Sequence, residues 1–280
     1  MSDIVFLNGK FLPKNEAFIS PEDRGFNFAD GVYEVVKYYK GRPFRMGDHI
    51  ERLARSLHEI QISFSVDYHL LKMFAELLSL NGLSSADAGI YLQISRGSHQ
   101  RVHHFPAVIE PTIYAFSFPF PSFSDKLAKG ITVITAEDIR WLRCDIKSVS
   151  LLPNTMLYNE AVENGAGECF LIRDGVVTEA THSSVFGVKN GTVITHPLSY
   201  MILPGITRKV VLEICQEQGI PYKEVAISID ELSYMDELFI TGTGSEITPV
   251  VKINDRLVGN GKPGRVTRQL QQLFFESVKK

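Results

Sequence analysis

The sequence predicts an α+β fold built from two domains. Short runs rich in β-branched and aromatic residues alternate with helical stretches, without the regular strand-helix-strand repeat that builds a parallel sheet. Residues 118–124 contain two prolines and two serines and show no periodicity, which favours a linker. We therefore expect one domain over residues 1–120 and a larger one over residues 121–280.

The first domain is predicted to open with two β-hairpins. Residues 4–7 form a strand-like run, and the Asn-Gly pair at 8–9 is typical of the turn into a second strand. Residues 31–39 are again rich in β-branched and aromatic side chains, and Lys40-Gly41 ends that run in a turn.

Two helices and two more strands complete this domain. The first helix is predicted to begin at Asp48, whose carboxylate would cap it three residues before Glu51. Its apolar side chains recur on one face, at Ile50, Leu53, Leu57 and Ile60. A second helix is expected near residues 70–80, followed by strands at 90–94 and 111–118.

In the second domain, strand-like runs and helices are mixed. The predicted strands are at residues 131–134, 168–172, 184–188, 192–195 and 237–241, and the predicted helices are near residues 154–164, 207–218 and 265–279. This mixture supports the α+β class and contains no internal repeat.

Composition limits the functional classes. The chain has 280 residues, 44% of them hydrophobic, and 29 basic against 32 acidic residues, a net charge of −3. This balance favours a soluble protein that acts on small molecules over one that binds nucleic acid or a membrane surface. No apolar run approaches the roughly 18 residues of a membrane span, and residues 1–5 lack a basic export signal, so a cytoplasmic location is expected. Three cysteines without C-x-x-C spacing indicate buried thiols.

Lys147 lies in a mostly apolar run, residues 144–152. Lysines in strand-like runs commonly face solvent. Burial among Ile146, Val149 and Leu151 would instead favour the neutral amine, the form that attacks an aldehyde. We therefore expect a buried lysine strand with a chemical role.

Three further segments supply polar groups, and two of them are suited to an anionic ligand. Residues 204–207 precede a predicted helix whose first amides are unpaired, and the Thr207 hydroxyl adds a donor, so a phosphate would be well held there. Residues 241–244 could add backbone donors, but Ile247 stands where a dinucleotide motif needs its third glycine. Glu179 supplies a carboxylate, although a Thr-Glu pair at a strand end is usually a solvated turn.

Residues 96–106 are the segment most informative about substrate. In an extended chain Arg101 and His103 would project to one face and offer two donors to a single carboxylate. A polar exposed loop is the alternative. A metal site from His99, His103 and His104 is a third interpretation, but no carboxylate or cysteine joins them at useful spacing.

The sequence resembles the D-amino acid aminotransferases of the fold-type IV pyridoxal-phosphate family. The resemblance is carried, in chain order, by the lysine run, Glu179, the helix start at 204–207 and the turn at 241–244. The resemblance covers nearly the whole chain. It implies a small N-terminal α/β domain, a larger β-barrel-like C-terminal domain with helices, and pyridoxal 5'-phosphate as cofactor.

The resemblance also assigns roles to residues. Lys147 would form the covalent link to the cofactor and move the proton between the substrate Cα and the cofactor C4′, while Glu179 would keep the pyridine nitrogen protonated. The other cofactor contacts implied are Arg52, Leu203, Ile206, Thr207 and Thr243. Without the resemblance, Arg52 would be interpreted as a surface arginine.

For the substrate, the resemblance implies a carboxylate-binding site made of Tyr33, Arg101 and His103. Arg101 and His103 would be donated in trans within a homodimer. The implied reaction exchanges an amino group between a D-amino acid (D-alanine or D-glutamate) and a 2-oxo acid (2-oxoglutarate or pyruvate). Two positions depart from the pattern: His182 replaces a serine, and Gly242 replaces a residue with a hydroxyl group.

Three alternatives remain open from the sequence. An L-branched-chain aminotransferase would share the lysine, glutamate and helix-start motifs but is not expected to have the Arg101/His103 pair. An aminodeoxychorismate lyase fits less well, because that pair suits a simple α-carboxylate. A cofactor-binding protein without turnover is disfavoured by the presence of both Lys147 and Glu179.

Overall fold

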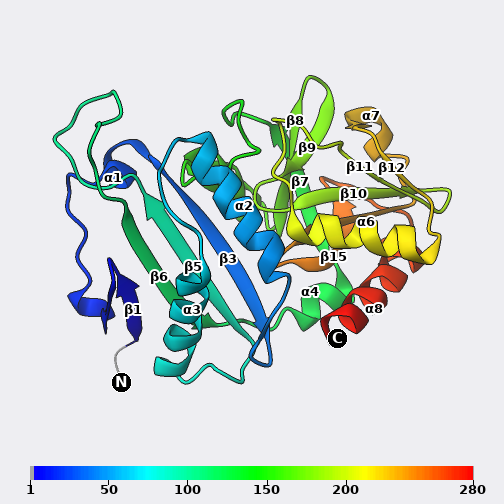
Figure 1. Ribbon diagram of the computed structural model, residues 1–280. Helices are drawn as coiled ribbons and strands as arrows, with labels where there is room; N and C mark the ends of the chain where they lie inside the picture. The colour runs from blue at the N-terminus through cyan, green and yellow to red at the C-terminus, as the bar shows by residue number, and fades with distance from the viewer. Residues whose placement is uncertain (1–2, 280) are drawn as a thin grey trace. The chain divides into compact units, whose positions relative to one another are not determined.

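The computed structural model describes residues 3–279, so Met1, Ser2 and Lys280 lie outside it. Met1 and Ser2 belong to the segment in which an export signal was sought. The chain divides into two compact units (Figure 1). The first contains the described residues up to Pro121 together with Ile146–Ser150. The second contains Ser122–Asp145 and the described residues from Leu151 onward. The predicted linear boundary did not include the short return of the chain at Ile146–Ser150.

The first unit is built on a six-stranded antiparallel sheet in the order β2-β1-β6-β5-β3-β4. Its strands are β1 (Ile4–Leu7), β2 (Lys10–Pro13), β3 (Gly31–Tyr39), β4 (Arg42–Pro43), β5 (Ala88–Ser95) and β6 (Thr112–Pro119). Both predicted hairpins are present. Their turn residues Asn8, Gly9, Lys40 and Gly41 all adopt the positive φ that such turns require.

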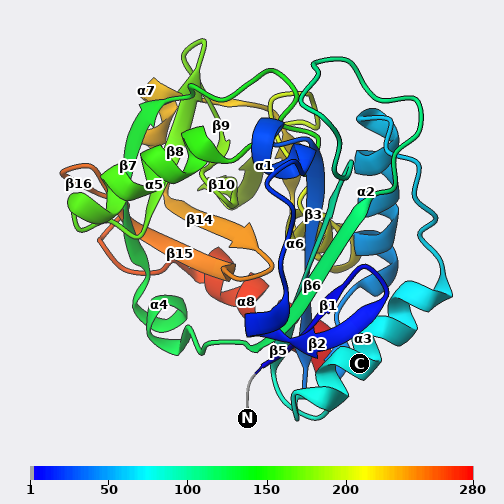
Figure 2. The same ribbon diagram turned by 90° about the vertical axis from the view of Figure 1, so that its left-hand side faces the viewer.

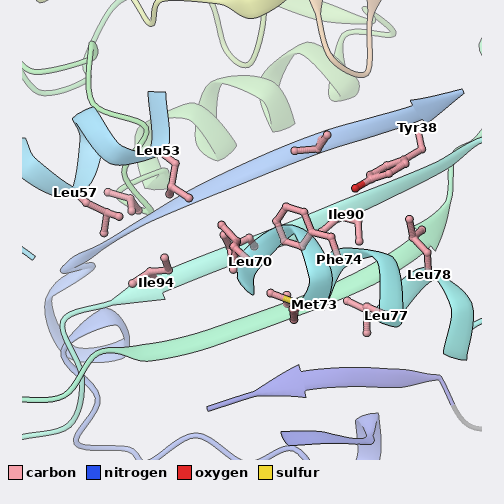
Figure 3. Packing of buried hydrophobic residues seen from close by; sticks show 14 of the residues in the cluster. Tyr38, Leu53, Leu57, Leu70, Met73, Phe74, Leu77, Leu78, Ile90 and Ile94 are labelled. Carbon is pink, nitrogen blue, oxygen red and sulfur yellow. The ribbon is translucent and has the colours of Figure 1, made fainter. Parts of the chain in front are cut away.

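Helices α2 (Met46–Glu59) and α3 (Tyr68–Leu80) lie against one face of this sheet (Figure 1). Phe74 and Leu77 of α3 are fully buried in one hydrophobic cluster with the sheet residues Ile90 and Ile94, and Phe74 lies beside Ile90 (Figure 3). The remaining elements of the unit are the 3₁₀ turn η1 (Lys14–Glu16) and the short helix α1 (Arg24–Phe28).

The predicted start of the first helix was wrong by two residues. The helix begins at Met46 after Arg45, whose φ of 54° is left-handed, and Asp48 lies within the first turn. Its carboxylate pairs with Arg45 at 3.6 Å. An acidic side chain is favourable anywhere in the first turn, so its presence alone did not locate the cap.

The second unit is built on a ten-stranded mixed sheet that curls on itself, in line with the predicted barrel-like domain (Figure 2). Along the path from β12 to β13 the order is β12-β11-β10-β14-β15-β7-β8-β9-β13, and β16 pairs with β15. The strands are β7 (Ile131–Glu137), β8 (Glu168–Arg173), β9 (Val176–Ala180), β10 (Ser184–Lys189), β11 (Thr192–Thr195), β12 (Tyr222–Glu224), β13 (Ile227–Ser228), β14 (Glu237–Gly242), β15 (Glu246–Ile253) and β16 (Arg256–Leu257).

Strand β15 was not predicted because it contains Pro249, which cannot donate to a sheet. Pro249 is accommodated because the pairing of β15 with β7 begins only at the next residue, Val250. The helices of this unit are α4 (Ser124–Lys129), α5 (Leu152–Glu163), α6 (Ile206–Gln218), α7 (Ile229–Leu232) and α8 (Arg265–Lys279). Within residues 3–279 none of the helices has the length and apolar character needed to cross a bilayer.

Candidate active site

The sequence predicted that Lys147 lies in a buried strand. The structure shows that it does not. Its segment is a series of bends with a single bridge between Ser148 and Val32, and the lysine side chain is only half-buried. The neighbours Ile146 and Ser148 are buried, whereas the Lys147 side chain between them is partly exposed. The lysine is therefore fixed by its buried neighbours and remains accessible.

The backbone of Lys147 is tied to the first unit by two hydrogen bonds. Tyr33 N donates to the Lys147 carbonyl at 3.0 Å, and Lys147 N donates to Ser56 Oγ at 3.2 Å. Its Nζ lies 4.3 Å from the centre of the Tyr33 ring, which in turn stacks on Tyr91 at 5.6 Å. The structure thus brings together Lys147 and Tyr33, two of the predicted site residues.

Arg52 is buried, so its interpretation as a surface arginine was wrong. Its Nε and Nη2 donate to the two carboxylate oxygens of Glu34 at 3.0 and 2.7 Å, and His49 Nδ1 lies 3.0 Å from Glu34 Oε1. Burial alone would raise the pKa of Glu34, but the charges of Arg52 and His49 outweigh it and hold that pKa well below its ordinary range.

Glu34 and His49 were not predicted as site residues, although a signal was available. Glu34 stands between Val32 and Val36 on the buried face of β3, where an unpaired carboxylate would be very costly. A carboxylate at such a position requires a cationic partner from another element, and the sequence did not show that this partner is Arg52.

Arg101 and His103 lie in the loop between β5 and β6, and both are exposed. They meet at one aromatic ring: the guanidinium of Arg101 is 4.9 Å from the centre of Phe28, and the His103 ring is 5.6 Å from it in an edge-on arrangement. Neither side chain has a hydrogen-bond or ion-pair partner among residues 3–279. Both keep their donors for an external anion.

Glu179 belongs to the second unit and is buried near the end of β9. Its Oε1 accepts a hydrogen bond from Arg140 Nη1, and its Oε2 accepts one from the amide of Leu203 at 3.1 Å. Burial raises the pKa of Glu179 above its ordinary value, while the Arg140 guanidinium acts in the opposite direction. The alternative of a solvated turn is therefore excluded.

Arg140 is held in turn by Asp138. Arg140 Nε and Nη2 each donate to this carboxylate at 2.8 Å, and Thr178 Oγ1 donates to it at 2.9 Å. Burial opposes ionisation of Asp138, but its contacts with Arg140 dominate and lower its pKa. Sequence reasoning did not assign a role to Asp138 or Arg140, even though the Asp-x-Arg spacing lies in the segment that carried the family resemblance.

The N-terminus of α6 has the features expected of a phosphate site. Its N-cap is Gly205, and no side chain of the described residues caps it, which leaves the amides of Ile206 and Thr207 available. A Cβ at Gly205 would lie 2.7 Å from Ser184 Oγ, so a larger residue would require that hydroxyl to move. Leu203, whose amide binds Glu179, is three residues from Ile206, a span of about 10 Å at most.

The turn that contains Thr243 follows β14 in the same unit. Ser184, which Gly205 contacts, pairs in register with Thr241, and Ser183 Oγ lies 2.8 Å from Ser245 Oγ across the turn. Thr241 Oγ1 is buried and has no hydrogen-bond partner among the described residues. These links place the end of β14 beside the start of α6.

The two departures from the family pattern differ in consequence. A Cβ at Gly242 would make ordinary contacts of 3.4–3.5 Å, so space does not require glycine there. His182 Nδ1 lies 2.9 Å from Thr181 Oγ1 and within ion-pair distance, 3.0 Å, of Glu168 Oε2, an oxygen that has no hydrogen-bond partner among the described residues. His182 thus contacts the buried Glu168 at the turn after Glu179, and the structure gives it no contact with Glu179 itself.

Comparisons with known proteins agree with these features. Residues 31–253 match the family model described as amino-transferase class IV. The chain is 42% identical to a D-alanine aminotransferase of Bacillus licheniformis, covering 98% of this chain and 96% of that one. It is 44% identical to one of Staphylococcus haemolyticus, covering 98% and 97%.

Solved structures with the same fold carry a different name. The branched-chain amino acid aminotransferase of Escherichia coli matches with a TM-score of 0.91 and 27% identity, over 99% of this chain and 94% of that one. The branched-chain amino acid aminotransferase of Thermobaculum terrenum, solved in its PLP-bound holo form, matches with a TM-score of 0.87 and 25% identity over the same shares.

The substitution Glu34→Gln should lower the free energy of unfolding by roughly 3–5 kcal/mol near neutral pH, because it leaves a buried arginine without its counter-charge. The pKa of Glu34 is lowered in the folded protein, so its stabilisation is complete above about pH 4.3 and is lost progressively as the pH falls from there toward the much lower folded-state pKa. Urea unfolding of both proteins at about pH 7 and about pH 3 measures this. A difference that stays constant between the two pH values would contradict it.

Proposed function

Because the chain belongs to the class IV aminotransferases, we propose that it exchanges amino groups between D-amino acids and 2-oxo acids with pyridoxal 5'-phosphate as cofactor. Relatives named D-alanine aminotransferase are 40–44% identical over nearly the full chain. The branched-chain enzymes share the fold at 25–27% identity. D-alanine and D-glutamate are the expected donors, and 2-oxoglutarate and pyruvate the expected acceptors.

The described residues fit this cofactor. The first-turn amides of α6 and the Thr207 hydroxyl would hold the phosphate with Arg52 and Thr243, and Leu203 would support the ring. Glu179 would face the pyridine nitrogen, where a carboxylate keeps the ring protonated. Burial raises the pKa of Glu179 despite the Arg140 guanidinium, and a pyridinium beside it would further stabilise its charged form. When bound, the cofactor supplies an electron sink for the substrate Cα.

Lys147 would provide the amine that binds the cofactor aldehyde and then move the proton at the substrate Cα. Its half-exposed position and fixed backbone support this role, because a proton carrier must reach its target. The Tyr33 ring below Nζ limits the directions in which the amine can move. Tyr33 would also line the substrate carboxylate site.

One observation favours an α-carboxylate substrate above all others: Arg101 and His103 share a ring and have no anionic partner among residues 3–279. Two cationic or polar donors converging on one point are suited to a carboxylate. The branched-chain alternative would not require this pair. We propose that the pair fixes the carboxylate and thereby selects the D-enantiomer.

We further propose that the enzyme is a cytoplasmic homodimer in which Arg101 and His103 serve the partner's active site. The face of the first unit's sheet opposite α2 and α3 supports a dimer. It presents a row of contacting, only half-buried rings, namely Tyr33, Tyr91, Tyr114, Phe116 and Phe118. An aromatic face of this kind is suited to burial against a second copy.

The function is tested by incubating the protein with separate D- and L-amino acids and 2-oxoglutarate. D-alanine should give pyruvate and glutamate, whereas L-leucine, L-isoleucine and L-valine should give at most trace turnover. Chiral chromatography of the glutamate identifies the enantiomer formed. Preferential turnover of the branched L-amino acids would establish the alternative function.

Lys147→Ala should lose the covalent cofactor link and nearly all turnover, because no other amine would occupy its place. Borohydride reduction of the wild type followed by peptide mapping should label Lys147. The exposed Lys129 is the control, since Lys129→Ala should keep both the label and the activity. Labelling of another lysine would show that the assignment is wrong.

Glu179→Gln should retain the cofactor but slow Cα deprotonation on the order of a hundredfold, because an amide cannot keep the pyridine nitrogen protonated. Single-turnover kinetics with D-alanine, protiated and deuterated at Cα, measure this step. The same change at the exposed Glu217 of α6 is the control and should have no effect. An unchanged deprotonation rate would remove Glu179 from the mechanism.

Arg101→Ala should lower kcat/KM for D-alanine by roughly one to two powers of ten, the cost of a charge-assisted bidentate contact of about 1.5–3 kcal/mol, and should leave cofactor content unchanged. Donation in trans is tested by mixing the inactive Lys147→Ala variant with the weakened Arg101→Ala variant under conditions that exchange subunits. Recovered activity is expected from mixed dimers with one intact site. No recovery, despite proven exchange, would exclude donation in trans.

A further inference from the structure

We propose that Phe28 is a positioning residue that holds Arg101 and His103 ready for the substrate carboxylate. The inference rests on the proposed function, which makes these two side chains the carboxylate-binding pair. Phe28 is the last residue of α1, and its ring contacts the Arg101 guanidinium at 4.9 Å and the His103 ring at 5.6 Å with an interplanar angle of 61°. One side chain thus fixes both members of the pair.

The kind of contact matters, because it leaves the donors of Arg101 free. A guanidinium over an aromatic ring is attracted through its face, whereas it binds a carboxylate through the N–H groups at its edge. Arg101 makes no hydrogen bond or ion pair with any other residue that the structure describes. Phe28 can therefore restrain the guanidinium without competing with the substrate.

The other arginines around this loop use their donors differently. Arg24 Nε binds Asp30 at 2.8 Å and its Nη1 binds the Val102 carbonyl at 2.6 Å. Arg96 Nε and Nη2 bind the same carboxylate at 2.7 and 2.9 Å. Their donors are committed to the fold, and Arg101 is the arginine of this group that is held by an aromatic ring alone.

These structural arginines also anchor the loop, at one point within the pair and at one point after it. Arg24 holds the backbone at Val102, between Arg101 and His103, and its guanidinium also lies 4.7 Å from the Phe28 ring. Arg96 lies 3.5 Å from the centre of the Phe105 ring, two residues after His103. The loop is thereby held at two points, and the contacts of Phe28 with the Arg101 and His103 side chains add a further restraint on it.

The position of Phe28 is determined by a tightly specified segment. The Asp23 carboxylate caps α1 by accepting from Gly25 N at 2.7 Å, and Ala29, with φ of 52°, ends the helix. β3 begins two residues later at Gly31 and carries Tyr33. Both ends of α1 are thus fixed, and the ring lies on a rigid element, as a residue that orients a flexible loop must.

The test compares Phe28→Leu, Phe28→Tyr and the control Phe26→Leu in the holoenzyme. Phe26 belongs to the same helix and is 78% exposed. Phe28→Leu should raise KM for D-alanine about threefold to tenfold with little change in kcat, the effect of losing one exposed cation–π contact together with the histidine contact. Phe28→Tyr should restore the wild-type KM, since the aromatic face is retained. Phe26→Leu should match the wild type.

Two readouts separate positioning from general damage. The half-reaction with an amine that lacks a carboxylate, such as ethylamine, should proceed equally in all four proteins, because it does not use the pair. Hydrogen exchange of residues 97–108 should be faster in Phe28→Leu than in Phe28→Tyr, while cofactor content stays equal. An unchanged KM in Phe28→Leu, or an equal loss with ethylamine, would overturn the proposal.

The outcome also distinguishes this inference from the function on which it rests. If the wild type does not transaminate D-alanine, the proposed function fails, and the exchange measurement alone decides whether Phe28 restrains the loop. Equal exchange of residues 97–108 in Phe28→Leu and wild type would then refute the positioning role.

Discussion

The chemistry of the second unit depends on one buried guanidinium. Arg140 lies between the carboxylates of Asp138 and Glu179, and each would be costly to bury without it. By binding one oxygen of Glu179, while Leu203 binds the other, Arg140 fixes the plane of that carboxylate. The arrangement keeps Glu179 ionisable in an apolar setting, which is the property a partner of a pyridine nitrogen needs.

The first unit shows two ways of using arginine. Arg24 and Arg96 are both paired with the carboxylate of Asp30, which stabilises the fold because the opposite charges compensate one another in a buried place. Arg101 lies over an aromatic ring in an exposed loop. An arginine whose donors bind a buried carboxylate stabilises the fold here, whereas Arg101, which binds none, keeps its donors available for a ligand. The role of each of these arginines therefore depends on its partner more than on the residue type.

Local pattern sufficed for much of the fold. Hydrophobic periodicity and turn residues predicted β3, α3 and α8 nearly to their ends, and the helix start at α6 was within one residue. The burial of Lys147 was predicted wrongly, since its run is apolar on average but the lysine itself is partly exposed between buried neighbours. The pairing of Arg140 with Glu179 could not be predicted, because the two are 39 residues apart and only the folded sheet joins them.

The return of Ile146–Ser150 to the first unit has a consequence for synthesis. Ile146 belongs to the hydrophobic core formed by strands and helices that end by Pro121. A nascent chain that has just completed those strands still lacks this part of its core, and domains fold as units during translation. The first unit can reach its final packing only after residue 150 has left the ribosome, so the segment with Lys147 is among the last pieces to be incorporated.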